Sequence, residues 1–373
     1  MHAWASTFLF FILVLTAYGS SSDSHPGVNL KPQQEDPNSR IKIHDINTAE
    51  LIRKSIIRYI WNNTENLPST NAETKLDSPP TPNLFNADLR GVNYHLASKV
   101  ERLKYNMMYD YVHTTYIIHP LNKNIPKPTI MLVHQGHQGG LGDGVLELIN
   151  DLLRQGVFVA VTQMPMVGWN SKLKLKQGEK KSIGTHGHNH LFNAHKKNSG
   201  KAMSFFIEPI ISIIDHVKAK KTHIENIGIV GLSGGGWTSQ ISSAVDERIN
   251  LSVSIAGSYP LYLRKSYPGS TGDAEQTEPD LYLNLASYLD IYILGSIGFN
   301  REQVQIINKY DPCCFYGDGA EHYMFILDSH VKKLGGKWSL LLDDTHSLHQ
   351  ISPWARKKII EKLIELEWLN AKS

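Results

Sequence analysis

A serine set among glycines is the residue whose surroundings point most directly to chemistry. Ser233 lies in the sequence Gly-Leu-Ser-Gly-Gly of residues 231–235, which fits the pattern G-x-S-x-G, after the apolar run Ile227–Val230 and before a helical stretch. A serine at a sharp turn from strand to helix presents its hydroxyl above the sheet edge, and small neighbours relieve the crowding there. We therefore predict that Ser233 is a nucleophile. The alternative is a glycine-rich turn with an idle serine.

A nucleophilic serine needs a general base that a carboxylate orients. In doubly wound proteins with this motif, the acid and then the base follow the serine along the chain, each after a strand. Asp311 follows a late strand-like run and is the preferred acid, with Asp318 as the alternative. His346 follows the last strand-like run by a shorter loop than His349, so His346 is the preferred base and His349 the alternative.

Backbone N–H groups must also hold the negative charge that develops on an attacked carbonyl oxygen. The Gly234 N–H, directly after the serine, is one expected donor. The second should come from the loop that follows an earlier strand, in the sequence His-Gln-Gly-His-Gln-Gly-Gly of residues 134–140. Gly136 is the preferred donor there and Gln135 the alternative. A glycine-rich turn with no role in catalysis would have the same composition.

The elements that must position these residues alternate between strands and helices. Short, continuous apolar runs are typical of strands buried on both faces of a parallel sheet, and a mixed run indicates an antiparallel strand. Helical stretches separate them, so we predict an α/β fold with a mostly parallel sheet and helices on both faces. The expected strands are 111–118 (antiparallel), 129–133, 157–161, 227–230, 251–255, 304–308 and 338–342, and the expected helices are 145–154, 202–218, 238–245, 320–334 and one that begins at Pro353.

From about Asn83 onward the chain resembles an α/β-hydrolase, on the strength of residues 134–137, the serine motif, Asp311 and His346. The resemblance implies an eight-stranded, mostly parallel sheet and a Ser-Asp-His triad that usually cleaves esters through an acyl-enzyme. It implies no metal or organic cofactor. In this family an insertion such as residues 259–298 commonly covers the active site as a small cap, although a helix packed on the core is the alternative.

The N-terminal part of the chain reads as a leader and an extension. Residues 8–15 are uninterrupted apolar residues, too few to span a bilayer, and small residues follow, so residues 1–19 are expected to be a cleaved secretory signal. A retained anchor is the alternative. Residues 20–82 form a polar extension with one short helix and a proline-rich linker, and residues 83–373 form the catalytic domain. Asn62 and Asn250 fit the N-glycosylation pattern of a secreted glycoprotein.

The sequence leaves the roles of one cysteine pair and one histidine cluster undecided. Cys313 and Cys314 are the chain's only cysteines, and they form either a vicinal disulfide, a link to a second chain, or buried thiols. His186, His188, His190 and His195 have a spacing that can collect zinc, but no carboxylate or cysteine lies among them, so we predict a loop near the active site and no metal.

Composition limits the remaining function classes. The chain has 373 residues, of which 41% are hydrophobic, and a formal charge of +3, so it can bury a core and gives no sign of nucleic-acid binding. We expect a secreted serine esterase that acts on a small-molecule or glycan ester, with no stable membrane span. A catalytically inactive binding protein on the same fold and a serine peptidase are the alternatives. The sequence does not indicate the oligomeric state.

Overall fold

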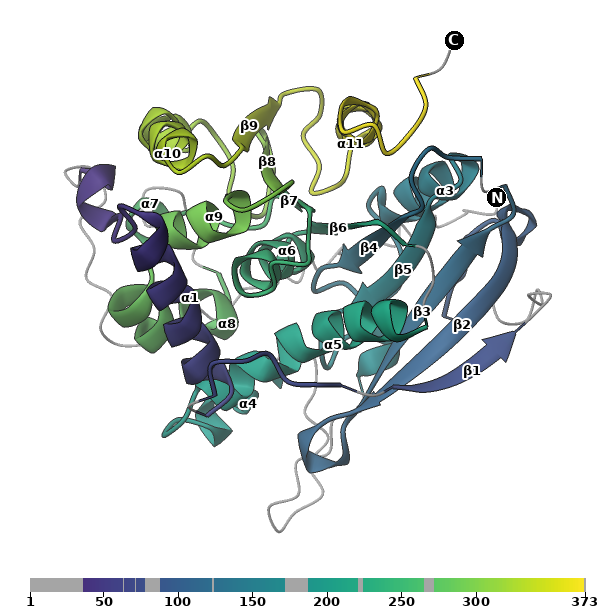
Figure 1. The fold of residues 1–373 in the computed structure, drawn as a ribbon, viewed down its shortest axis with the longest axis horizontal. Helices are drawn as coiled ribbons and strands as arrows, with labels where there is room; N and C mark the ends of the chain where they lie inside the picture. The colour runs from purple at the N-terminus through teal and green to yellow at the C-terminus, as the bar shows by residue number, and fades with distance from the viewer. Residues whose placement is uncertain are drawn as a thin grey trace, which may run out of the picture.

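A single twisted sheet with helices on both faces organises the molecule (Figure 1). The computed structural model describes residues 36–62, 64–70, 72–77, 88–122, 124–171, 187–220, 224–264 and 272–371. The expected secretory signal and the proline-rich linker lie outside these residues, as does His186. Within the described residues, none of the helices is both long and apolar enough to cross a bilayer.

The sheet has nine strands in the order β1-β2-β3-β5-β4-β6-β7-β8-β9. The first three strands and β5 pair antiparallel, and every pair from β5 through β4 to β9 is parallel. The strands are β1 (Glu73–Asp77), β2 (Ala97–Asn106), β3 (Val112–Pro120), β4 (Thr129–Gln135), β5 (Phe158–Gln163), β6 (Asn226–Leu232), β7 (Leu251–Ile255), β8 (Glu302–Asn308) and β9 (Trp338–Asp343).

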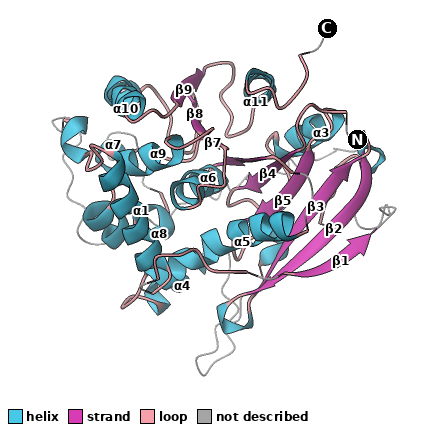
Figure 2. Cartoon of the chain, viewed as in Figure 1, coloured by secondary structure: helices cyan, strands magenta, loops and turns pink. Residues whose placement is uncertain are grey.

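Helices cover the two faces unequally, as Figures 1 and 2 show. Helices α3 and α11 pack on one face, and α1, α5, α6, α9 and α10 pack on the other. The helices are α1 (Ile46–Ile60), α3 (Val145–Arg154), α4 (Gly187–Ala194), α5 (Gly200–Ala219), α6 (Gly234–Val245), α7 (Leu261–Arg264), α8 (Ala274–Thr277), α9 (Tyr288–Ser296), α10 (Glu321–Lys333) and α11 (Pro353–Glu365).

The central strands are apolar on both faces because both faces are covered. In β4, Ile130 and Leu132 pack toward α5, whereas Met131 and Val133 pack toward α3 and α11. All seven residues of β4 are buried. Because strands β4, β6, β7, β8 and β9 run parallel, their carboxyl ends lie along one sheet edge, where loops can carry functional groups.

The sheet has one strand more than the eight expected, because β1 adds to an edge. Its sequence Glu-Thr-Lys-Leu-Asp has no apolar alternation, and residues 73–75 are exposed. Helix α1, also from the segment expected as an extension, buries Ile56, Ile57 and Ile60 in the same core as α5 and α6. Part of that segment therefore packs onto the sheet.

The apolar run after β7 contributes to the core. Tyr282, Tyr288 and Tyr292 are all buried, and Tyr282 accepts a hydrogen bond of 2.7 Å from the Trp237 indole of α6. Helix α9 packs directly on α6. These tyrosines therefore pack in the core, which is one of the two arrangements that the sequence left open for this insertion.

Candidate active site

The turn at Ser233 has the strained geometry that its sequence predicts. Ser233 joins β6 to α6 with φ 59° and ψ −125°, and its N–H donates to the Ile255 carbonyl at 2.8 Å. A Cβ on Gly231 would lie 2.2 Å from the Gly235 carbonyl carbon, and one on Gly235 would lie 2.2 Å from the His134 carbonyl oxygen. Only glycine fits at either position. Strain held in this way by close packing is typical of functional turns.

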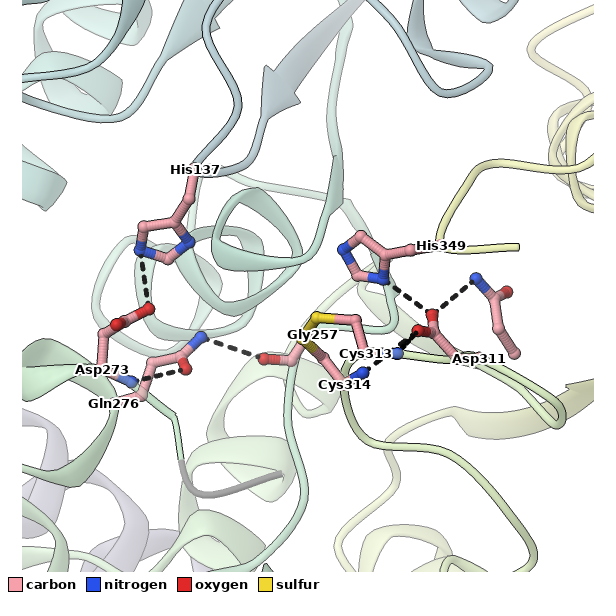
Figure 3. The surroundings of a disulfide bond; sticks show 9 residues. His137, Gly257, Asp273, Gln276, Asp311, Cys313, Cys314 and His349 are labelled. Atoms are coloured by element: carbon pink, nitrogen blue, oxygen red, sulfur yellow. Dashed lines mark hydrogen bonds and ion pairs between the residues drawn. A yellow bond between two sulfur atoms is a disulfide. The ribbon is translucent and has the colours of Figure 1, made fainter. Parts of the chain in front are cut away.

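Asp311 and His349 form the pair that could support this serine. Asp311 Oδ2 lies 2.7 Å from His349 Nδ1, and the Asp311 side chain is fully buried. Its Oδ1 accepts the N–H groups of Cys313 at 2.8 Å and Cys314 at 3.1 Å, and Asn308 Nδ2 donates to Oδ2 at 3.3 Å (Figure 3). Four donors thus hold this carboxylate. One of them is His349 Nδ1, so Nε2 is the ring nitrogen of His349 that remains for proton transfer.

His346, which loop length favoured as the base, is not the histidine bonded to Asp311. His346 Nε2 lies 3.3 Å from Asp343 Oδ2, and its Nδ1 accepts the Leu348 N–H at 3.0 Å. Asp343 is the last residue of β9, so the short loop leaves His346 beside the end of its own strand. The longer connection carries His349 across to the end of β8. Loop length alone therefore favoured the wrong histidine as the partner of Asp311.

Sheet order places Ser233 and Asp311 at the same edge of the sheet. Strands β6 and β8 are separated only by β7, and neighbouring strands are about 4.8 Å apart. Ser233 and Asp311 follow the carboxyl ends of these two strands. The alternative acid, Asp318, lies beyond them, where its carbonyl accepts the Glu321 N–H at 2.9 Å in the approach to α10.

The loop after β4 lies against the serine turn. A methyl group on Gly136 would be 2.8 Å from Ser233 Cβ and 3.3 Å from the Gly234 nitrogen. Gln135, the alternative donor, is the last residue of β4 and is registered against Gln163 of β5. The loop position that faces the Gly234 N–H is therefore Gly136.

Two carboxylates lie beside the second histidine of this loop. His137 Nε2 is 3.0 Å from both Asp273 Oδ2 and Glu275 Oε1. Burial alone would lower the pKa of His137, but the two carboxylates outweigh it and raise this pKa to about 10. Burial would likewise raise the pKa of Glu275, yet His188 and His137 hold it well below its usual range. The sequence interpretation missed both carboxylates, which lie in a polar stretch without a motif.

The two cysteines are joined to each other as a vicinal disulfide. Their consecutive N–H groups both point at Asp311 Oδ1 (Figure 3). Of the three arrangements open to the sequence, the structure has the first, and the cysteine pair is part of the backbone cradle of the acid.

Comparison with solved structures identifies the architecture. The chain is similar to methylesterase BT1017, with a TM-score of 0.59 and 15% identity over 88% of this chain and 66% of that one. It is similar to a glucuronoyl esterase from Solibacter usitatus, with a TM-score of 0.56 and 10% identity over 91% and 99% of the two chains. It is also similar to acetyl xylan esterase 1 from Thermoanaerobacterium sp. JW/SL YS485, with a TM-score of 0.55 and 11% identity over 88% and 97%.

These likenesses, together with the sheet order, show that the chain has the α/β-hydrolase fold that its motifs suggested. The chain spans just under two thirds of the length of the methylesterase. No protein-family model matches the sequence, and no curated protein matches it either. At such low identities the likeness defines the fold, and function must be argued from the site.

Proposed function

We propose that this protein is a serine hydrolase that cleaves carboxylic esters. The observation that carries the proposal is the pair formed by the buried Asp311 and the partly buried His349, which lies at the same sheet edge as the strained turn of Ser233. A buried carboxylate bonded to a histidine nitrogen is the arrangement that prepares an imidazole to act as a base. A histidine without a catalytic role rarely contacts a carboxylate that is itself fixed by four hydrogen-bond donors.

Each of these residues has its own role in the proposed reaction. Ser233 Oγ bonds to the acyl carbon while His349 Nε2 takes the hydroxyl proton, and Asp311 stabilises the imidazolium that forms. The N–H groups of Gly234 and Gly136 hold the oxyanion. When the acyl–oxygen bond breaks, His349 returns the proton to the departing alcohol. A water molecule, deprotonated by His349, then hydrolyses the acyl-enzyme and restores Ser233.

The substrate we propose is an ester of a carbohydrate or of a short acyl chain. The esterases to which the chain is similar are named for acetyl xylan and glucuronoyl esters and for methyl esters. The mature protein would be secreted. Of its two sequons, Asn62 is exposed, whereas Asn250 Nδ2 donates to the Asn300 carbonyl at 3.4 Å. If the protein is glycosylated, we therefore expect the glycan on Asn62 and not on Asn250.

A kinetic comparison of four proteins tests the proposal. Wild type should release nitrophenol from 4-nitrophenyl acetate with an initial burst, since an acyl-enzyme accumulates. Ser233→Ala and His349→Ala should each lower kcat by roughly 1,000-fold or more, whereas His346→Ala should change it by less than about tenfold.

The controls separate the alternatives. No turnover of any ester by wild type would favour the inactive binding protein, and preferential cleavage of peptide anilides would favour the peptidase. A larger loss in His346→Ala than in His349→Ala would contradict the assignment of the base. Circular dichroism of each variant establishes that it is folded.

A further inference from the structure

Four side chains from three separate segments meet beside the serine turn. They are His137 from the loop after β4, His188 from α4, and Asp273 and Glu275 from the start of α8; we call them the His137 cluster. Glu275 Oε1 lies 3.0 Å from His137 Nε2 and 3.1 Å from His188 Nδ1, and Asp273 Oδ2 lies 3.0 Å from His137 Nε2. The ligand atoms of the two histidines and Glu275 all lie within 4.8 Å of one another.

The cluster is built around a buried carboxylate that has spare binding capacity. The Glu275 side chain is completely buried, and its Oε2 has no hydrogen-bond partner among the described residues. A buried carboxylate oxygen without a partner is costly, so such a position favours a water, a proton or an ion that can bind to it. Asp273 is half exposed, which leaves a route from solvent to the cluster.

The second histidine is oriented as a metal ligand would be. His188 Nε2 lies 2.9 Å from the Pro165 carbonyl, which can only accept a hydrogen bond. The His188 Nδ1, which lies 3.1 Å from Glu275 Oε1, is then the ring nitrogen that would bind a cation. A backbone carbonyl that fixes the outer nitrogen is the usual support of a metal-bound histidine.

The spacing fits a tetrahedral ion. Zinc binds histidine nitrogen and carboxylate oxygen at about 2.0–2.2 Å, which places ligand atoms about 3.3 Å from each other. The three short contacts in the cluster, 3.0 to 3.1 Å, are close to that edge length. Two imidazole nitrogens favour zinc over magnesium or calcium, which prefer oxygen. Two neutral imidazoles and two carboxylates also balance the charge of Zn²⁺.

We propose that the His137 cluster binds one zinc ion, with His137 Nε2, His188 Nδ1, Glu275 and Asp273 as its ligands. The histidine-rich segment alone predicted no metal because it contains no carboxylate. The fold supplies two carboxylates from residues 273–275 and a histidine from the loop after β4. Of the described histidines of the histidine-rich segment, the cluster contains His188. His190 is exposed on the same helix, and His195 bonds to Tyr109 Oη at 2.6 Å instead.

The ion would also steady the loop that carries the expected oxyanion donor. A Cβ on Gly234 would lie 2.5 Å from His137 Cε1, so the imidazole packs directly against the residue after the serine. Fixing His137 on zinc therefore fixes the loop at Gly136, next to Gly234. This role rests on the proposed esterase function, whereas zinc binding itself does not.

Zinc binding is measured directly on the full chain, so that failure of the esterase proposal leaves this test intact. After dialysis against a chelator, wild type should take up one equivalent of zinc in competition with a chromophoric chelator, and added zinc should raise its Tm. Glu275→Gln and His188→Gln should weaken zinc binding by roughly 100-fold or more and abolish the shift in Tm. His190→Gln, on the same helix, and His349→Ala, beside the disulfide, should bind zinc as wild type does.

Two results would overturn the proposal. One is a wild type that binds no more zinc than Glu275→Gln while both are folded by circular dichroism, which would mean that protons alone neutralise the cluster. The other is an equal loss of zinc in His190→Gln, which would place the ion elsewhere. If Glu275→Gln does not fold, His188→Gln and the double variant Asp273→Asn/His137→Gln provide the same comparison.

Discussion

Asp311→Asn is the substitution whose effect the geometry defines most closely. Asp311 Oδ1 accepts two backbone N–H groups, from Cys313 and Cys314 at 2.8 and 3.1 Å. An amide nitrogen there would face two donors, so the asparagine must place its oxygen at that position. Its NH₂ group then faces His349 Nδ1, which is 2.7 Å from Oδ2 in the wild type.

The consequence is a change of tautomer. To accept a hydrogen bond from the amide, His349 must leave Nδ1 unprotonated and carry its proton on Nε2, where it cannot take the proton of Ser233. The imidazolium also loses its negative partner. Both effects together correspond to a fall in kcat of roughly 10⁴-fold, or about 5 kcal/mol of transition-state stabilisation.

The assay is steady-state hydrolysis of 4-nitrophenyl acetate at pH 7.5 by wild type, Asp311→Asn and the matched control Asp318→Asn. The control should retain kcat to within about tenfold, because the carboxylate bonded to His349 Nδ1 is that of Asp311. An Asp311→Asn variant that keeps more than a tenth of wild-type kcat would refute the reasoning. A large loss in Asp318→Asn alone would move the role of the acid to that residue.

Three further predictions concern strain, space and charge. Ser233→Gly removes the cost of the positive φ, so it should raise the free energy of unfolding in urea by about 1 kcal/mol while it abolishes turnover. An unchanged or lower free energy of unfolding would contradict the claim that Ser233 is strained. Gly136→Ala places a methyl group 2.8 Å from Ser233 Cβ and should lower kcat by roughly 100-fold. Gly142→Ala is the control, because its methyl group would have no atom within 4 Å, and it should leave kcat unchanged. An equal loss of kcat in the two variants would contradict the role of Gly136 as an oxyanion donor. Burial would raise the pKa of Glu101, but hydrogen bonds from two histidines and Lys220 hold it well below its usual range. Its charged form thus stabilises the fold above about pH 4.3, the unfolded value, and this contribution is lost as the pH falls further. Glu101→Gln should cost about 3 kcal/mol in urea unfolding at pH 7 and clearly less at pH 3; a cost independent of pH would contradict the ion-pair account.

The sequence was most informative where a chemical need leaves a local pattern. Runs such as 129–133 and 251–255 are buried on both faces, so their composition alone indicates parallel strands. The turn at Ser233 was predictable because the close approach of Gly231 and Gly235 admits no side chain. Pro353 begins α11, as the local sequence indicated, and Ser352 caps it.

The sequence was least informative where contacts form between distant segments. The sequence of β1 is polar and its residues 73–75 are exposed, so its pairing with β2 leaves no apolar period. The choice between His346 and His349 depends on how far one loop reaches across the sheet edge, and local spacing does not encode that distance. Glu275 is buried only because α8 folds back beside His137 and His188, and nothing near it in sequence indicates this.

Labelling with a fluorophosphonate, mapped by peptide mass spectrometry, tests the central claim most directly. The account predicts a single adduct on Ser233 in wild type, no adduct in Ser233→Ala, and slow labelling in His349→Ala because the hydroxyl has lost its base. An adduct on any other residue, or undiminished ester hydrolysis by a wild type that resists labelling, would contradict it.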